Sequence, residues 1–70
     1  MVGQVAGADL AYLTDRVAVN EGRAQTYGTQ FHVLEGVRQP RPIRDVKEVD
    51  KRRKAVGLKT LKEYTEFINT

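Results

Sequence analysis

Side chains that can donate, accept or titrate are concentrated between residues 15 and 32 of this 70-residue chain. The candidate ligand-binding residues of this segment are Arg16, Glu21, Arg23, Gln25, Tyr27, Thr29 and Gln30. In a binding interpretation, Arg16 or Arg23 binds an anionic group of a ligand, and Gln25 and Gln30 form hydrogen bonds with amide groups of the ligand. In a structural interpretation, Asp15 pairs with an arginine and the segment forms a network that fixes a loop. The structural interpretation is favoured, because polar networks are common where a helix, a turn and a strand converge.

Acid–base catalysis is an alternative chemistry for the same segment. The candidate catalytic residues are Asp15, Tyr27 and His32, whose side chains can donate or accept a proton. The imidazole group of histidine is suited to this chemistry, because its ordinary pKa of ~6.5 is close to neutrality. His32 is the only histidine, and a lone histidine on a half-exposed strand is more often an ordinary surface residue. No cysteine and no HxH or HExxH spacing accompanies it, so no metal site is predicted. Serine, the Rossmann glycine pattern and the P-loop pattern are absent too, and no cofactor is predicted.

Basic residues are concentrated in a second segment, from residue 38 to 54. This segment has eight basic and three acidic residues, a net charge of +5, whereas the rest of the chain carries −2. A nucleic-acid-binding accessory protein is therefore a further alternative. Glu48 precedes Arg52 by four residues, and Asp50 stands in the same relation to Lys54. On a helix this spacing predicts ion pairs that partly neutralise the basic face, so nucleic acid is a partner that is not favoured.

The element that carries the start of the polar segment is predicted to be a helix. Residues 1–8 have no periodicity and are expected to form a flexible N-terminal arm. Asp9 is suited to the N-cap, and Leu10, Leu13 and Val17 recur at helical spacing as one apolar stripe. Gly22 ends the helix, since glycine readily takes the left-handed C′ conformation.

A β-hairpin is predicted to carry the end of the polar segment. Apolar and polar residues alternate from residue 29 to 39, and Glu35 and Gly36 interrupt the alternation. A type I turn with a glycine bulge and a two-residue turn both fit this pair. Pro40 and Pro42 cannot donate to a ladder, so the second strand should lie at an edge or continue as an extended segment.

Two short helices are predicted at the C-terminal end. Asp45 with Glu48 and Thr60 with Glu63 both match the spacing of a capping box. Gly57 separates the two helices. The predicted fold class is α+β, with an N-terminal helix, a β-hairpin and two short C-terminal helices in a single small domain over residues 9–70.

Length and composition bear on compartment and assembly. A chain this short buries only about 60% of its unfolded surface, so its own core is marginal. Without cysteine it has no disulfide framework, and no apolar run approaches the ~20 residues that span a bilayer. We expect a cytoplasmic protein with no membrane association. Because each helix has one thin apolar stripe, we expect a homo-oligomer or a complex with a helical partner chain.

One spaced pattern covers most of the chain, from Leu10 to Tyr64. Its parts are DRV at 15–17, EG at 21–22, Q at 25, YGTQF at 27–31, PI at 42–43, VD at 49–50, RR at 52–53, GL at 57–58, L at 61 and EY at 63–64. This pattern resembles an uncharacterised bacterial family of unknown function. The resemblance implies the C-terminal part of a longer, largely helical protein, and it implies no activity. The leading prediction is an interaction or ligand-binding module with a polar site in the Arg16–Gln30 segment, completed by self-association or by a partner chain.

Overall fold

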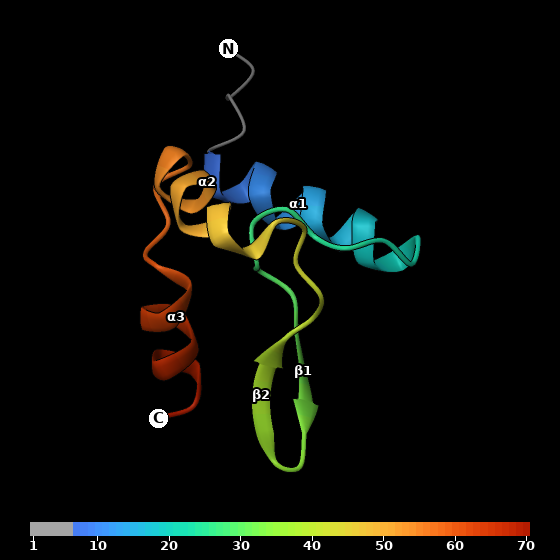
Figure 1. Ribbon diagram of the computed structural model, residues 1–70, viewed down its shortest axis with the longest axis vertical. Helices are drawn as coiled ribbons and strands as arrows, with labels where there is room; N and C mark the ends of the chain where they lie inside the picture. Colours follow the sequence, from blue (N-terminus) through green and yellow to red (C-terminus); the bar gives the residue numbers. More distant parts are fainter. Residues whose placement is uncertain (1–6) are drawn as a thin grey trace.

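The computed structural model describes residues 7–70. Along this part of the chain lie α1 (Gly7–Asn20), β1 (Phe31–Leu34), β2 (Val37–Pro40), the 3₁₀ helix η1 (Val46–Glu48), α2 (Val49–Ala55) and α3 (Leu61–Ile68). α1 crosses one end of the molecule, the hairpin extends away from it, and α3 runs beside the hairpin (Figure 1). These elements form one small domain. The order of helix, hairpin and helices confirms the predicted α+β fold.

α1 begins at Gly7, before the predicted N-cap Asp9, which lies in the first turn of the helix. Of the predicted arm, residues 1–6 are outside the described residues. The helix ends as predicted. Gly22 has a φ of 74°, and the Arg23 N–H donates to the Ala18 carbonyl at 2.8 Å, as in a Schellman motif.

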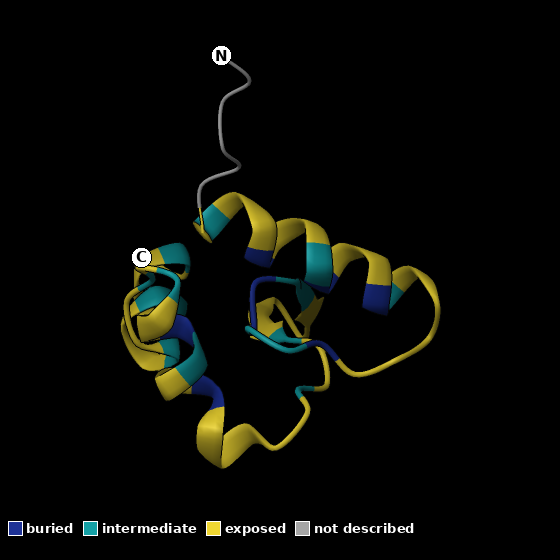
Figure 2. Cartoon of the chain, turned by 90° about the horizontal axis from the view of Figure 1, so that it is seen from above, coloured by how far each residue is buried: buried dark blue, intermediate teal, exposed yellow. Residues whose placement is uncertain are grey.

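The side of α1 that packs on the domain is different from its apolar stripe. Ala11, Asp15 and Ala18 are buried, and their spacing places them on one side, toward the loop and the hairpin (Figure 2). Three larger apolar side chains are instead between 42% and 51% exposed: Val17, Leu10 and Leu13. Alanine has no side-chain atom beyond Cβ, so the loop backbone can lie close to this side of the helix. The apolar stripe is left facing outward.

The hairpin turn contains two residues. Leu34 pairs with Val37, and Glu35 and Gly36 between them have φ angles of 52° and 79°. Two consecutive left-handed residues are what a type I′ turn requires, and its twist matches the twist of the flanking strands. The structure thus selects one of the two turns that the sequence left open.

Pro40 ends β2 at a position that needs no ladder donor. It lies opposite Phe31, and the neighbouring Arg41 N–H donates to the Gln30 carbonyl at 2.9 Å. Antiparallel ladders alternate between hydrogen-bonded and non-hydrogen-bonded pairs, and Pro40 occupies the second kind. The proline therefore removes no hydrogen bond from the sheet.

The predicted capping box at Asp45 is wrong. Asp45 has a φ of 43° and makes no side-chain cap hydrogen bond in the described chain, and η1 intervenes before α2. A left-handed Asp45 cannot aim its carboxylate at the first-turn amides, because an N-cap residue normally has an extended backbone. The end of α2 follows the prediction, since Gly57 has a φ of 80° and the Leu58 N–H donates to the Arg53 carbonyl at 2.9 Å.

The capping box of α3 is confirmed. The Glu63 N–H donates to the Thr60 hydroxyl at 3.2 Å, and the Thr60 N–H donates to the Glu63 carboxylate at 3.3 Å. The Leu61 N–H, another free donor of the first turn, is bound by the Asp50 carboxylate at 2.8 Å. α2 therefore contributes an acidic group to the start of α3, where the helix dipole favours negative charge.

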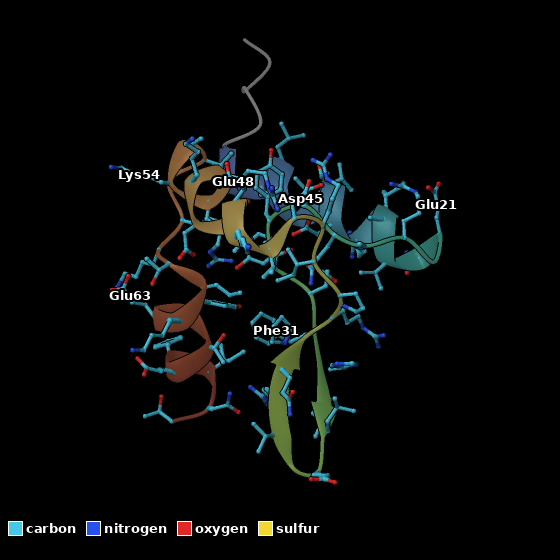
Figure 3. All side chains as sticks on the ribbon, viewed as in Figure 1. Glu21, Phe31, Asp45, Glu48, Lys54 and Glu63 are labelled. Atoms are coloured by element: carbon cyan, nitrogen blue, oxygen red, sulfur yellow. The ribbon has the colours of Figure 1, made fainter. Side chains whose placement is uncertain are left out.

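The interior of the described chain is more polar than apolar. Its largest fully buried side chains are Arg53, Gln25 and Asp15, whereas Ala11, Ala18 and Val49 are its buried apolar residues. Phe31 points into the space between the hairpin and α3 (Figure 3), where its ring meets the ring of Tyr64 edge-on with the centroids 5.5 Å apart. None of the helices between Gly7 and Thr70 has the length and apolar character needed to cross a bilayer.

Candidate functional site

The buried carboxylate of Asp15 organises the loop that follows α1. It accepts hydrogen bonds from the backbone N–H groups of Thr26 at 2.8 Å, Tyr27 at 3.0 Å and Thr29 at 3.0 Å. The Thr29 hydroxyl donates to it as well, at 2.9 Å. Four donors around one carboxylate compensate for its loss of hydration. Asp15 thus holds the loop by its backbone, as the structural interpretation of the polar segment predicted. The predicted pairing of Asp15 with an arginine is wrong, because Arg23 binds Glu21 and the donors to Asp15 belong to the loop itself.

Gln25 fixes the other end of the same loop. Its side-chain amide donates to the carbonyls of Gln30 at 2.9 Å and Arg41 at 2.8 Å, and its side-chain oxygen accepts from the Gln30 N–H at 2.8 Å. The side chain is fully buried. It does bind amides, as the binding interpretation proposed for a glutamine, but these amides belong to its own domain.

Arg53 is the third buried polar side chain, only 2% exposed. Its guanidinium donates to the carbonyls of Lys59 at 2.6 Å and Tyr27 at 2.9 Å, and its Cζ atom lies 5.4 Å from the centroid of the Tyr64 ring. Burial lowers the pKa of Arg53, and the nearby Asp50 carboxylate opposes this effect. One charged side chain therefore joins the loop, the α2–α3 connection and α3.

Sequence reasoning placed Arg53 in a solvated basic run and missed this role. The available signal was its position, because Arg53 lies four residues after Val49 and three before Val56, inside the apolar stripe of α2. Its neighbour Arg52 also turns inward and donates to the Thr26 carbonyl at 2.7 Å.

The ion pairs predicted on this helix are replaced by other contacts. Glu48 lies 3.9 Å from Lys51 instead of pairing with Arg52. Asp50 binds the first turn of α3. Both predicted arginine and lysine partners have different surroundings, since Arg52 binds backbone carbonyls and Lys54 points away from the body of the molecule (Figure 3).

Gly28 allows the loop to lie directly against the C-terminal half of the domain. A Cβ atom at this position would be 3.0 Å from a methyl carbon of Leu61 and 3.2 Å from one of Ile43. The φ of 70° also favours glycine. The close backbone approach that Gly28 allows is therefore an internal packing contact.

Two of the predicted ligand-binding residues, Arg16 and Gln30, meet on the surface. Together with Asp9, Tyr12 and Leu13 they line a groove of about 330 Å³ along α1. A hydrogen bond with Tyr64 raises the pKa of Tyr12, and burial adds to the effect. We call this the α1 groove. It borders the exposed apolar stripe, because Leu13 belongs to both.

Glu21 and Arg23 lie elsewhere, beyond the end of α1. The Arg23 side chain donates to the Glu21 carboxylate at 3.0 Å, and both residues are exposed. Arg23 lines a separate cavity of about 200 Å³ with Arg41 and Pro42. The predicted set of ligand-binding residues is thus divided among the buried network, this pair and the α1 groove.

The three candidate catalytic residues do not meet around one cavity. Asp15 is buried under the loop, and Tyr27 enters the network through its backbone. His32 lies half-buried on β1 beside a cavity of about 240 Å³, which it lines together with Arg38 and Tyr64. Among the described residues, neither Asp15 nor Tyr27 lines that cavity. Nor does any group of three or more His, Cys, Asp or Glu side chains between residues 7 and 70 lie close enough to hold a metal ion.

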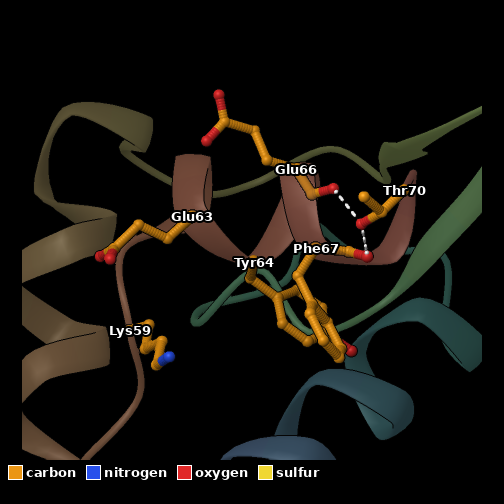
Figure 4. Close-up of a pocket in the computed structure, with 6 residues that line it drawn as sticks. All are labelled: Lys59, Glu63, Tyr64, Glu66, Phe67 and Thr70. Atoms are coloured by element: carbon orange, nitrogen blue, oxygen red, sulfur yellow. Dashed lines mark hydrogen bonds between the residues drawn. The ribbon is translucent and has the colours of Figure 1, made fainter.

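A further cavity of about 570 Å³, larger than the three already described, lies along α3 and was not predicted (Figure 4). It is lined by Lys59, Glu63, Tyr64, Glu66, Phe67 and Thr70. Phe67 is 75% exposed. Hydrogen bonds from Thr60 lower the pKa of Glu63, so this carboxylate is already engaged at the helix start.

A comparison with protein-family models places the chain in a known family. Residues 2–70 match the model of a family of unknown function, DUF6624, and the chain belongs to this family. The match confirms the predicted resemblance to a family without an assigned activity. No curated protein and no solved structure matches the chain.

Proposed function

We propose that this domain is an interaction module that docks a protein partner on the outward side of α1. The observation that carries the proposal is the exposed apolar stripe of Leu10, Leu13 and Val17, which faces away from a polar interior. Exposed apolar surface is unfavourable by about 25 cal/mol per Å², and side chains at this helical spacing form a contiguous surface. Contiguous apolar surface bordered by polar residues is typical of an interaction site.

The α1 groove supplies the polar border. Arg16 and Gln30 lie on its lining with Asp9, so charged and amide groups stand next to the apolar stripe. Protein interfaces commonly combine an apolar centre with such a polar rim. In this proposal Arg16 and Gln30 contact the partner, whereas Asp15 and Gln25 hold the loop that positions Gln30.

Catalysis is supported less by the geometry. The Asp15 carboxylate, the best-enclosed acidic group, is surrounded by four donors of its own domain, and His32 lines a different cavity. A general acid or base needs a free position within hydrogen-bond reach of a substrate.

Photo-crosslinking in cells that produce the chain tests the proposal. Leu13 is replaced by the photoreactive residue p-benzoylphenylalanine, and Leu34, a leucine of the hairpin that is 45% exposed, is replaced in a matched control. We expect irradiation to join position 13, and not position 34, to a protein. Equal labelling of both positions, or no product at position 13 in a chain that is folded by circular dichroism, would contradict the proposed function.

A further inference from the structure

The outward side of α1 has the spacing of a coiled-coil seam. Leu10 and Val17 are seven residues apart and Leu13 lies between them, so they take the a and d positions of a heptad. Asp9 and Arg16 each directly precede an a position and are therefore at g, along one border of the stripe. Both are exposed on the helix. In coiled coils the residues at e and g select the partner and its orientation.

An antiparallel pair of α1 helices brings the two leucines of the stripe together and places opposite charges next to each other. In such a pair an a residue packs against a d residue of the other helix, so Leu10 meets the partner's Leu13 and Leu13 meets the partner's Leu10. The g positions then face each other, which brings Asp9 opposite the partner's Arg16. Two-fold symmetry repeats this ion pair. In a parallel pair, by contrast, g faces e, and Asp9 would meet the partner's Thr14, which is uncharged. Arg16 would face the partner's Glu21, which lies beyond the end of α1 and is already paired with Arg23.

We infer that the partner of this surface is a second copy of the chain, docked antiparallel along α1, and this inference rests on the proposed function. The partner's Arg16 reaches the border of the α1 groove at Asp9, so each copy contributes a side chain to the groove of the other. The interface is isologous, because the same stripe and the same groove are used twice.

The pair should be weak and reversible. The two helices overlap over a length on the order of 15 Å, at 1.5 Å per residue. Such a contact buries less than the ~800 Å² per partner of a standard interface. Exposed ion pairs add modest stabilisation that salt screens. We therefore expect association in the micromolar range or weaker, strongest at low ionic strength.

Sedimentation equilibrium of the full chain tests the inference at concentrations from about 10 µM to about 1 mM. The expected result is a rise in mass from 7.9 kDa toward twice this value. Leu13→Glu should remain monomeric with an unchanged circular dichroism spectrum, because its side chain faces solvent in the single domain. Leu34→Glu is the matched control and should associate like the wild type. A folded wild-type chain that stays monomeric throughout this range would overturn the inference.

A charge exchange between copies tests the register and does not depend on Leu13→Glu. Asp9→Arg alone places arginine against the partner's Arg16, and Arg16→Asp alone places two aspartates together. We expect each variant by itself to associate about five- to tenfold more weakly than the wild type. An equimolar mixture of the two variants restores both ion pairs and should associate like the wild type. A mixture that associates no better than either variant overturns the antiparallel arrangement.

The two proposals fail in different ways. If position 13 crosslinks to another protein while the chain sediments as a monomer, the second copy is wrong and the interaction module stands. If position 13 crosslinks to nothing and the chain is monomeric, both are wrong.

Discussion

Three buried polar side chains fix the conformation of the loop in this domain, a role that a large apolar core has in most domains. Asp15, Gln25 and Arg53 come from α1, the loop and α2, and each binds backbone groups of the loop between residues 24 and 30. A buried polar group without a partner is strongly unfavourable, so these contacts specify one loop conformation. No buried side-chain nitrogen or oxygen of the described chain lacks a partner.

Asp15→Asn should lower the free energy of unfolding by about 3 kcal/mol. The amide nitrogen would face N–H donors that the carboxylate now binds, and at least one donor would lose its acceptor. Urea unfolding followed by circular dichroism measures the change. Asp45→Asn is the control, because Asp45 is exposed and has a left-handed backbone that asparagine tolerates. An Asp15→Asn variant as stable as this control would show that the network is not required for folding.

Gln25 and Gln30 offer a matched pair of substitutions to alanine. Gln25→Ala removes three hydrogen bonds in a fully buried position and should cost about 2–4 kcal/mol. The Gln30 side chain makes one hydrogen bond, to the Thr29 hydroxyl at 3.1 Å, so Gln30→Ala should cost less than about 1 kcal/mol. Thermal melts of both variants give the order. The reverse order would mean that the Gln30 side chain, and not its backbone, holds the loop.

The polar segment could be predicted from the sequence, but which of its side chains are buried and which are exposed could not. The density of polar residues from Asp15 to Gln30 correctly indicated a network. Which side chains enter the interior depends on contacts across 11 to 26 residues of chain, such as those of Asp15 and Arg53. Local spacing places Arg53 in the apolar stripe of α2, but it does not identify partners this far along the chain. The neighbouring basic residues predict a surface position for Arg53, and the structure buries it.

Among the helices, three of the predicted ends are confirmed, whereas the starts predicted at Asp9 and Asp45 are wrong. Gly22, Gly57 and the Thr60 capping box depend on a few neighbouring residues, and all three behave as expected. The buried side of α1 depends on what packs against it. Ala11 and Ala18 flank the buried Asp15, and their small size admits the loop backbone where larger residues would keep it away.

The capping box of α3 gives a pH-dependent contribution to stability. Hydrogen bonds from Thr60 lower the pKa of Glu63 below its ordinary value of 4.5 in the folded state. The ionised carboxylate therefore stabilises the fold above the ordinary value, and this contribution is lost as the pH falls through the lowered one. Glu63→Gln retains a cap acceptor without a titrating group.

Thermal melts between about pH 7 and about pH 3 should show this difference. The wild type should lose more of its melting temperature on acidification than Glu63→Gln does. Glu66→Gln, on the same helix, is the control and should follow the wild type. Identical acid dependence in the wild type and Glu63→Gln would show that the box contributes nothing through its charge.

Across the whole molecule, polar and apolar residues have partly exchanged their usual places. Charged and amide side chains are buried, whereas Leu10, Leu13 and Val17 lie outside, together with Phe67 on α3. A chain of this size has little apolar surface to bury, and a domain that leaves part of it exposed gains stability when a partner covers it. The docking through α1 that we propose would therefore follow from this distribution of residues.

The basic segment should give the whole molecule only weak affinity for nucleic acid. Arg52 and Arg53 bind backbone carbonyls, which leaves Lys51 and Lys54 as exposed cations of α2, and Glu48 lies near Lys51. Phosphate contacts of this kind give dissociation constants of about 10⁻⁴–10⁻⁶ M at physiological salt.

Replacing Lys51 and Lys54 together by glutamine should weaken this binding and reduce its salt dependence by about one phosphate contact for each lysine, without loss of the fold. Fluorescence anisotropy with a labelled duplex, measured at several salt concentrations, follows both quantities. Arg53→Gln is the informative contrast, because it removes hydrogen bonds to the Tyr27 and Lys59 carbonyls and should unfold the domain while removing no phosphate contact. Submicromolar, sequence-selective binding at 150 mM salt by the wild type would contradict this assignment, since phosphate contacts alone cannot distinguish one base sequence from another.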